Sequence, residues 1–131
     1  MLPNRVAAVI IINKKILLVT GYEGVFYWTP GGKIEGRESH ENCLIRELFA
    51  ELGIELESMK YYATFTFQNE IKGGIQTNHY YLVQFKGKIK PGQEITNIFW
   101  YSKQNFINKK PKISKGIETY LIPKLIDEGY L

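Results

Sequence analysis

Residues 31–54 read GGKIEGRESHENCLIRELFAELGI, and this stretch decides how the rest of the chain is organised. It begins with a glycine pair, continues through a polar loop, and becomes a helical pattern after Ser39, a residue type that caps helix N-termini. Gly53 follows the last apolar residue of the pattern, where a left-handed cap favours glycine. The stretch therefore predicts a glycine-rich turn, a loop, and a helix of about three to four turns.

The predicted helix has two different faces when residues are placed about 100° apart. We expect the apolar arc to pack on a sheet, and it contains Leu44, Ile45, Leu48, Phe49 and Leu52. The opposite arc carries Glu47 and Glu51, which lie side by side because they are four residues apart. Such a pair repels unless a cation is near, and Mg2+ prefers carboxylate oxygens together with substrate phosphates. A solvated acidic face is the alternative interpretation of the two glutamates alone.

The spacing of the whole stretch resembles the Nudix box. That pattern is a glycine, five residues, a glutamate, seven residues, and then Arg-Glu-aliphatic-x-Glu-Glu-x-Gly-aliphatic. Here Gly32 and Glu38 take the first two places, and residues 46–54 read RELFAELGI. At background residue usage, the polar and glycine identities alone would coincide on the order of once in ten million starts. The resemblance implies a single Nudix domain over residues 1–131, with its box at 32–54. The implied fold class is α/β, an α/β/α sandwich with a mixed β-sheet between helices.

This sequence departs from the family pattern at several positions. Ala50 replaces the first glutamate of the Glu-Glu pair, which in the family commonly helps to hold metal, so the number of bound ions stays open. Residues 35–38 read EGRE where relatives often have Glu-x-Gly-Glu, which brings Arg37 into the loop. Arg37 either contacts a substrate phosphate or stays in solvent. The second predicted strand ends at Thr20, where relatives often have an arginine that approaches the substrate.

The resemblance also implies the chemistry of the site. Nudix enzymes hydrolyse a nucleoside diphosphate linked to another group, and divalent ions neutralise the phosphate oxygens. By analogy, Glu47 and Glu51 are catalytic and hold Mg2+, with Mn2+ as a substitute. Arg46 and Glu38 would form an ion pair that orients these carboxylates. A surface salt bridge of little energetic value is the alternative interpretation of that pair.

Further site residues are predicted outside the helix. Glu94 lies in a loop where relatives often place an extra acidic residue, and we expect it to be a metal ligand unless it is an ordinary polar loop residue. The predicted substrate-binding residues are Gly31, Gly32, Arg37, Tyr27 and Tyr81. The glycines allow close approach of the backbone to a ligand, and the tyrosines would stack on a base. Further candidates are Tyr22, Phe26 and Phe65 for stacking and Glu70 for the metal.

Three functions compete on this evidence. The first is Mg2+-dependent hydrolysis of nucleoside or deoxynucleoside triphosphates to a monophosphate and pyrophosphate, favoured because the chain has no length left for an extra recognition domain. The second is cleavage of ADP-ribose or a nucleotide sugar. The third belongs to another class, a non-catalytic nucleotide-sensing module, and is motivated by Ala50 and the missing strand-end arginine.

Length and composition limit the number of domains, the compartment and the partners that we expect. A chain of 131 residues is one domain, and its single cysteine, Cys43, suits a packing role in the reducing cytoplasm. The longest apolar run, residues 6–13, is too short to span a bilayer, and we expect no membrane association. The net charge of +4 attracts anions. No aromatic-basic signature of an RNA-binding module accompanies it, so we expect a small-molecule nucleotide and not a nucleic acid as partner. Monomer and homodimer stay open.

Hydropathy patterns predict the remaining elements. We expect strands over 6–12, 16–20, 61–67, 76–85 and 95–101, an irregular segment over 54–59, a basic loop over 105–115, and a helix over 116–128. The first two strands would form a hairpin, and so would the third and fourth. Pro123 interrupts the last helix.

Overall fold

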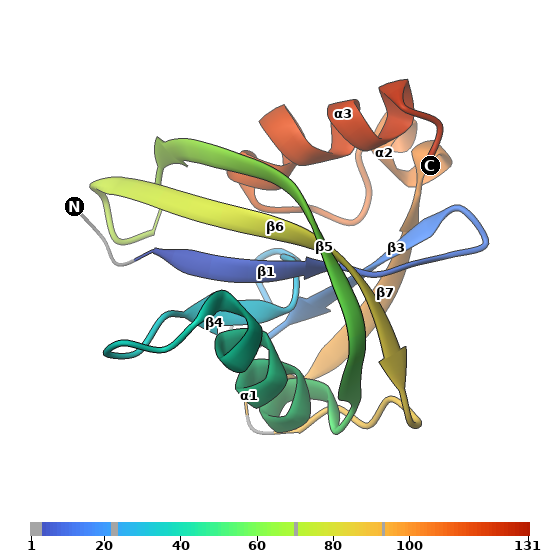
Figure 1. Cartoon of the computed structure of the whole chain (residues 1–131). Coiled ribbons are helices and arrows are strands. Elements are labelled where there is room, and N and C mark those ends of the chain that lie inside the picture. Colours follow the sequence, from blue (N-terminus) through green and yellow to red (C-terminus); the bar gives the residue numbers. More distant parts are fainter. Residues whose placement is uncertain (1–3, 22–23, 70, 93) are drawn as a thin grey trace.

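Two β-sheets lie at the centre of the computed structural model, which describes residues 4–21, 24–69, 71–92 and 94–131 (Figure 1). The larger sheet, in the order β4-β1-β6-β5, consists of β1 (Arg5–Val9), β4 (Gly31–Lys33), β5 (Glu55–Gln68) and β6 (Ile75–Lys86). The smaller sheet, in the order β2-β3-β7, consists of β2 (Ile11–Ile12), β3 (Lys15–Thr20) and β7 (Asn97–Ser102). Because β1 and β6 are parallel and the other pairs antiparallel, the larger sheet is mixed, as predicted.

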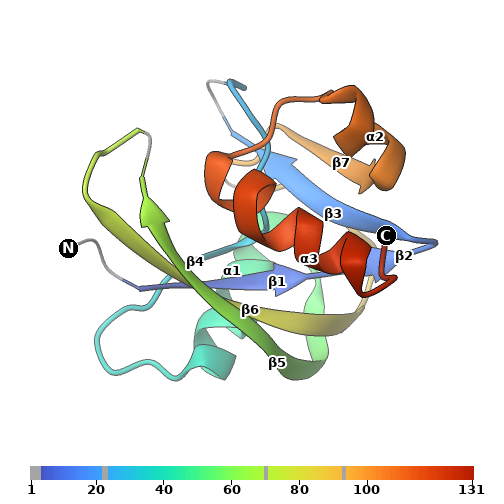
Figure 2. The same cartoon turned by 90° about the horizontal axis from the view of Figure 1, so that it is seen from above.

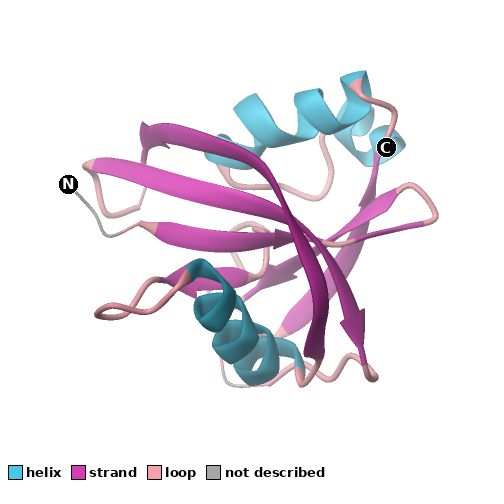
Figure 3. Cartoon of the chain, in the orientation of Figure 1, coloured by secondary structure: helices cyan, strands magenta, loops and turns pink. Residues whose placement is uncertain are grey.

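Helices cover the sheets from opposite sides, as Figures 1 and 3 show. On one side lies α1 (His40–Leu52), and on the other lie α2 (Lys103–Asn108), the π-helical turn η1 (Ile117–Leu121) and α3 (Ile122–Asp127). Seen from above, α3 lies over the strands (Figure 2). Side chains of β1 alternate between two cores, Val6 and Ala8 toward α1, Ala7 and Val9 toward η1 and α3. The predicted α/β/α arrangement is confirmed.

The caps of α1 are those predicted, but its buried face is different. Ser39 accepts a hydrogen bond from the Asn42 backbone N–H at 3.0 Å, and Gly53 ends the helix with φ 66°. Ile45 and Phe49, predicted to be buried, are 44% and 68% exposed. The buried stripe is Cys43, Leu44, Leu48 and Leu52. The helix is turned so that the glutamate flank, and not the Ile45 flank, faces β4.

Two strand predictions needed correction. The strand predicted over 6–12 divides between β1 and β2, because the chain crosses from the larger to the smaller sheet there. The segment predicted as irregular, 54–59, is the first part of β5, which pairs along β6 from Glu55 opposite Lys86. Register shifts between Leu56 and Ser58 and between Tyr61 and Ala63 interrupt the alternation of side chains, which hides the strand in the sequence.

The C-terminal segment also differs in part from expectation. The start of the predicted basic loop is helical, because α2 begins before it with a capping box between Ser102 and Asn105 and continues to Asn108. The predicted last helix is present as η1 followed by α3, and the Ile122 N–H donates to the Ile117 carbonyl five residues earlier. A π-helical turn is reasonable next to Pro123, because proline has no backbone N–H to donate to the regular α-helical pattern. Within the described part of the chain, none of the helices has the length and apolar character needed to cross a bilayer.

Candidate active site

Glu47 lies directly over the backbone of Gly32. A Cβ added to Gly32 would be 2.4 Å from Glu47 Cδ, so only glycine leaves room for the carboxylate here. The side chain of Glu47 is 17% exposed. The sequence analysis predicted that Gly31 and Gly32 bring the backbone close to a substrate, whereas in the structure the group that approaches Gly32 is a carboxylate of α1.

Glu51 occupies the matching place over Gly31. Its Oε1 accepts a hydrogen bond from the Gly31 N–H at 3.0 Å. Burial raises the pKa of Glu51 to about 7, the Arg5 charge and the Gly31 hydrogen bond oppose that rise, and neighbouring Glu47 adds to it. Two carboxylates therefore meet in a poorly solvated place, where a divalent cation would stabilise both. The donor set fits Mg2+, which commonly takes one or two protein carboxylates.

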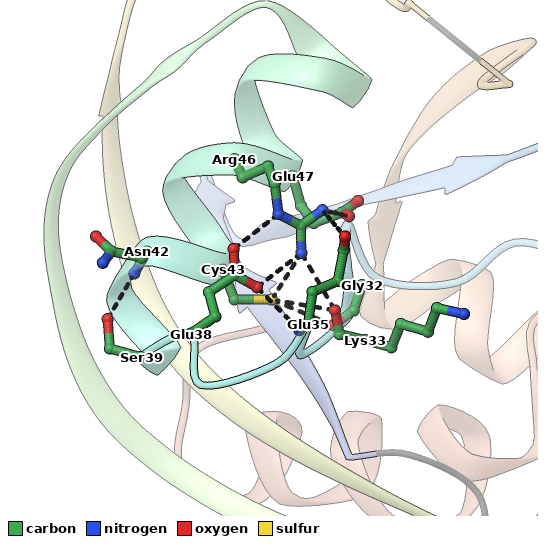
Figure 4. A network of polar contacts seen from close by, with 9 residues as sticks. All are labelled: Gly32, Lys33, Glu35, Glu38, Ser39, Asn42, Cys43, Arg46 and Glu47. Carbon is green, nitrogen blue, oxygen red and sulfur yellow. Dashed lines mark hydrogen bonds and ion pairs between the residues drawn. The ribbon is translucent and has the colours of Figure 1, made fainter.

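Arg46 ties this helix to the loop before it (Figure 4). Its Nε and Nη2 each donate to a different oxygen of Glu38 at 2.8 Å, so the predicted ion pair is present and bidentate. Its Nη1 contacts Glu47 and lies 3.4 Å from Glu35. Because of the Arg46 hydrogen bonds, the pKa of Glu38 falls to about 2. Glu47 is thus held between Gly32 on one side and Arg46 on the other.

Cys43 lies beneath this network and packs as predicted. Its thiol contacts the carbonyl oxygens of Gly32 and Lys33 at 3.5 and 3.6 Å. Burial raises the pKa of the Cys43 thiol to about 11, so the group is protonated at neutral pH and is no nucleophile.

A cavity of about 1030 Å³ opens beside the glutamate pair. That volume is at the upper end of the range for small-molecule sites. Its charged lining residues are Arg5, Lys33, Glu47, Glu51, Lys72 and Glu94, and its aromatic ones are Phe26, Trp28 and Phe67. In the part of the chain that the structure describes, no three His, Cys, Asp or Glu side chains are close enough to hold a metal. Glu94 therefore shares the cavity with the pair without joining it, and its role as a ligand stays a prediction.

The loop that carries Glu94 is fixed to the end of α1. The backbone N–H groups of Lys90 and Gly92 donate to the carbonyls of Leu52 and Glu51, each at 2.8 Å. These bonds satisfy carbonyl groups that the last turn of a helix leaves free. The helix end that positions Glu51 therefore also positions the loop of Glu94.

Several predicted substrate residues lie away from the cavity. Arg37 is exposed on its loop. The hydroxyl of Tyr81 is 2.6 Å from Nδ1 of His40, on the α1 side of the sheet. The hydroxyl of Tyr27 accepts from Asn97 at 3.0 Å. None of the three lines the cavity, so the geometry gives no support to their predicted contacts with substrate. Of the further candidates, Phe26 lines the cavity, Phe65 packs in the core on the α3 side, and Tyr22 and Glu70 lie outside the described residues.

Strand pairing brings residues to the cavity that the sequence analysis missed. Arg5 stands opposite Asn78 in the β1–β6 register, and Phe67 stands opposite Gln76 in the β5–β6 register. All of these line the cavity. Arg5 is further held by a 2.8 Å hydrogen bond from Nη2 to the Thr29 carbonyl. No local sequence signal marks these residues, because their neighbours come from distant strands.

Comparisons with known proteins point in one direction. A family model described as the NUDIX domain matches residues 1–121. The MutT NUDIX hydrolase from Burkholderia pseudomallei is similar in structure, with a TM-score of 0.67, 25% identity, and coverage of 78% of this chain and 84% of that one. The E. coli ORF135 protein gives a TM-score of 0.65 at 33% identity, covering 78% and 74%. A NUDIX hydrolase from Nitrosomonas europaea gives 0.74 at 23% identity, covering 97% and 88%. Sequence comparison with curated proteins finds no match.

Proposed function

We propose that this chain, which belongs to the Nudix family of hydrolases acting on pyrophosphate bonds, cleaves nucleoside or deoxynucleoside triphosphates to a monophosphate and pyrophosphate. One observation carries the proposal. The Glu47–Glu51 pair, seated on the glycine backbone of β4, faces a nucleotide-sized cavity that also holds cationic and aromatic side chains.

Glu47 and Glu51 would hold the Mg2+ that the family requires, with Mn2+ as a substitute. When bound, the ion supplies positive charge at the phosphate oxygens and makes water a stronger nucleophile. Ala50 removes one acid of the usual box, and the remaining pair still matches the number of carboxylates that Mg2+ commonly takes. Glu94 is the other carboxylate that lines the same cavity among the described residues, and it is our candidate for a third ligand.

The cations of the cavity favour a triphosphate over a sugar diphosphate. Arg5, Lys33 and Lys72 all line it, so positive charge is available for a longer phosphate chain. Arg5 also offers a guanidinium to the cavity from β1, whereas β3 ends at Thr20 without the arginine of relatives. We propose that Arg5 takes over the phosphate contact that Thr20 cannot make.

Arg46 acts through Glu47 and not on the substrate. It does not line the cavity, but it bonds Glu38 and contacts Glu47. Its role is to hold the Glu47 carboxylate in one orientation, which lets the pair bind a cation without reorganisation.

A substrate panel tests the proposal. Phosphate release would be followed with Mg2+ or Mn2+, coupled to pyrophosphatase for triphosphates and to alkaline phosphatase for ADP-ribose and UDP-sugars. We expect turnover of triphosphates. Turnover of ADP-ribose or nucleotide sugars alone would favour the second function, and nucleotide binding without any turnover would favour the sensor.

The site itself is tested by one substitution and its control. Glu51→Gln should lower kcat by at least ~100-fold, because a buried charge that serves the reaction is lost. Glu41→Gln removes an exposed acid in the first turn of the same helix and should leave kcat unchanged. A near-wild-type rate for Glu51→Gln contradicts the assignment of the site.

A further inference from the structure

Asn78 lines the cavity and carries a buried hydrogen-bond acceptor without a partner in the described part of the chain. The residue is 6% exposed and lies on β6 at the cavity wall. Its Nδ2 donates to the Tyr80 hydroxyl at 3.1 Å. Its Oδ1 is buried and has no hydrogen-bond partner in the described part of the chain. Buried polar atoms are nearly always paired, and an unpaired one is costly. The Asn78 carbonyl therefore suits a ligand that brings a donor.

Asn78 cannot easily turn away from the cavity. Its partner Tyr80 is fully buried, and the Thr29 side chain lies close enough to the Tyr80 hydroxyl to affect its pKa. Thr29 is in turn held by Arg5, whose Nη2 donates to its carbonyl at 2.8 Å. Contacts through Tyr80 and Thr29 thus connect the amide to Arg5, the cation that we assign to phosphate binding.

The surroundings of Asn78 suit a flat, partly polar ring. Phe67 comes from the neighbouring strand β5 and lines the same cavity. Its ring is held against the backbone of Gly116, where an added Cβ would be 2.5 Å from Phe67 Cζ. A fixed aromatic wall beside a fixed acceptor is an arrangement that recognises a nucleobase by stacking and by one edge contact.

We propose that Asn78 Oδ1 accepts a hydrogen bond from the exocyclic amino group of the substrate's base, with Phe67 as the stacking wall. The enzyme then prefers amino-bearing bases to keto bases of the same ring type. This inference rests on the proposed function, because it takes the ligand to be a nucleotide. It adds a specificity-determining residue that neither the box nor the glutamate pair supplies.

Paired nucleotides that differ at one exocyclic group test the proposal. We would measure kcat/KM for ATP against ITP and for CTP against UTP. In at least one pair, the wild-type protein should prefer the amino member by roughly 10- to 100-fold, the size expected when a buried acceptor gains its partner. Equal rates in both pairs, or a preference for the keto member, overturn the proposal.

Variants then assign the preference to Asn78. Asn78→Leu should bring the ratio to within about threefold of one, mainly by slowing the amino substrate. Asn78→Asp keeps an acceptor at this position and should keep the direction of the preference. Thr77→Val is the control, since Thr77 directly precedes Asn78 on β6 and its hydroxyl contacts Thr66 instead. An unchanged ratio in Asn78→Leu overturns the proposal.

A binding measurement separates failure of this inference from failure of the proposed function. Calorimetry with AMP against IMP and with CMP against UMP compares the same exocyclic groups without any turnover. If no triphosphate is cleaved, the proposed reaction is wrong, and the affinity ratio still decides the role of Asn78. Loss of that ratio in Asn78→Leu supports the inference, and equal affinities in wild-type protein refute it.

Discussion

Replacing Gly32 by alanine is expected to lower activity strongly while leaving the fold intact. The added Cβ would lie 2.4 Å from Cδ of Glu47 and 2.7 and 2.8 Å from its two oxygens. Carbon atoms in contact are ordinarily about 3.5 Å apart, so the carboxylate must retreat by about 1 Å. Such a misplacement of a reacting group can cost about 100-fold in rate, and we expect kcat to fall by that amount.

The same substitution should cost little stability. Gly32 has no positive φ, and the atoms that clash belong to the end of a side chain that can move. We therefore expect the free energy of unfolding to change by no more than about 1 kcal/mol, measured by urea titration. Gly31→Ala is the contrast, because its Cβ would be 2.1 Å from the Val6 carbonyl oxygen at φ 143° and should destabilise the fold.

A double-substitution cycle shows whether Glu47 carries the effect. In a Glu47→Ala background there is no carboxylate to displace, so Gly32→Ala should cause no further loss of kcat. Gly129→Ala controls for general glycine strain, since it has φ 82°, no atom within 4 Å of its added Cβ, and lies far from α1 in sequence. The reasoning fails if Gly32→Ala keeps wild-type kcat, or if its loss is equally large without Glu47.

Two further predictions concern the titratable side chains of Cys43 and His79. The Cys43 thiol should react with an aromatic disulfide reagent only after unfolding, because burial raises its pKa to about 11. Fast labelling of Cys43 in the native protein would contradict this prediction. Burial lowers the pKa of His79 below 6.5, and His40, whose ring lies 4.8 Å away, adds to this effect. The unfolded chain therefore binds a proton at His79 more readily than the folded protein does. Neutral His79 should contribute fully to the unfolding free energy above pH 6.5, and this contribution should fall as the pH drops through 6.5 toward the lower pKa of His79 in the folded protein. The measurement compares the unfolding free energies of wild type and His79→Gln at pH 7.5 and pH 5.5. The same difference at both pH values would refute the prediction.

The helix α1 was predictable because its signals are local. Ser39, the apolar spacing and Gly53 lie within one stretch, and each reports on its immediate neighbours. Which flank of the apolar arc would be buried was not predictable. Phe49 is exposed because the glycines of β4 admit glutamates on the other flank, and this depends on a tertiary contact. The first part of β5 was missed for a related reason, since its bulges depend on the partner strand.

The candidate site also has a part that could be predicted from local sequence and a part that could not. The glutamate pair and the ion pair of Arg46 with Glu38 follow from spacing within the box, and the structure brings them together. The cavity wall does not follow from any local spacing. Arg5 and Asn78 are neighbours only because β1 and β6 pair in parallel, so no short window of sequence contains them both.

The central claim is that Glu47 and Glu51 together hold a divalent ion beside a nucleotide. Its most direct test is calorimetric titration of Mg2+ into the protein saturated with a non-hydrolysable triphosphate, corrected for Mg2+ binding to the nucleotide alone. We predict a binding event in wild-type protein that disappears in the Glu47→Gln, Glu51→Gln double variant. Identical isotherms for the two proteins would contradict the account.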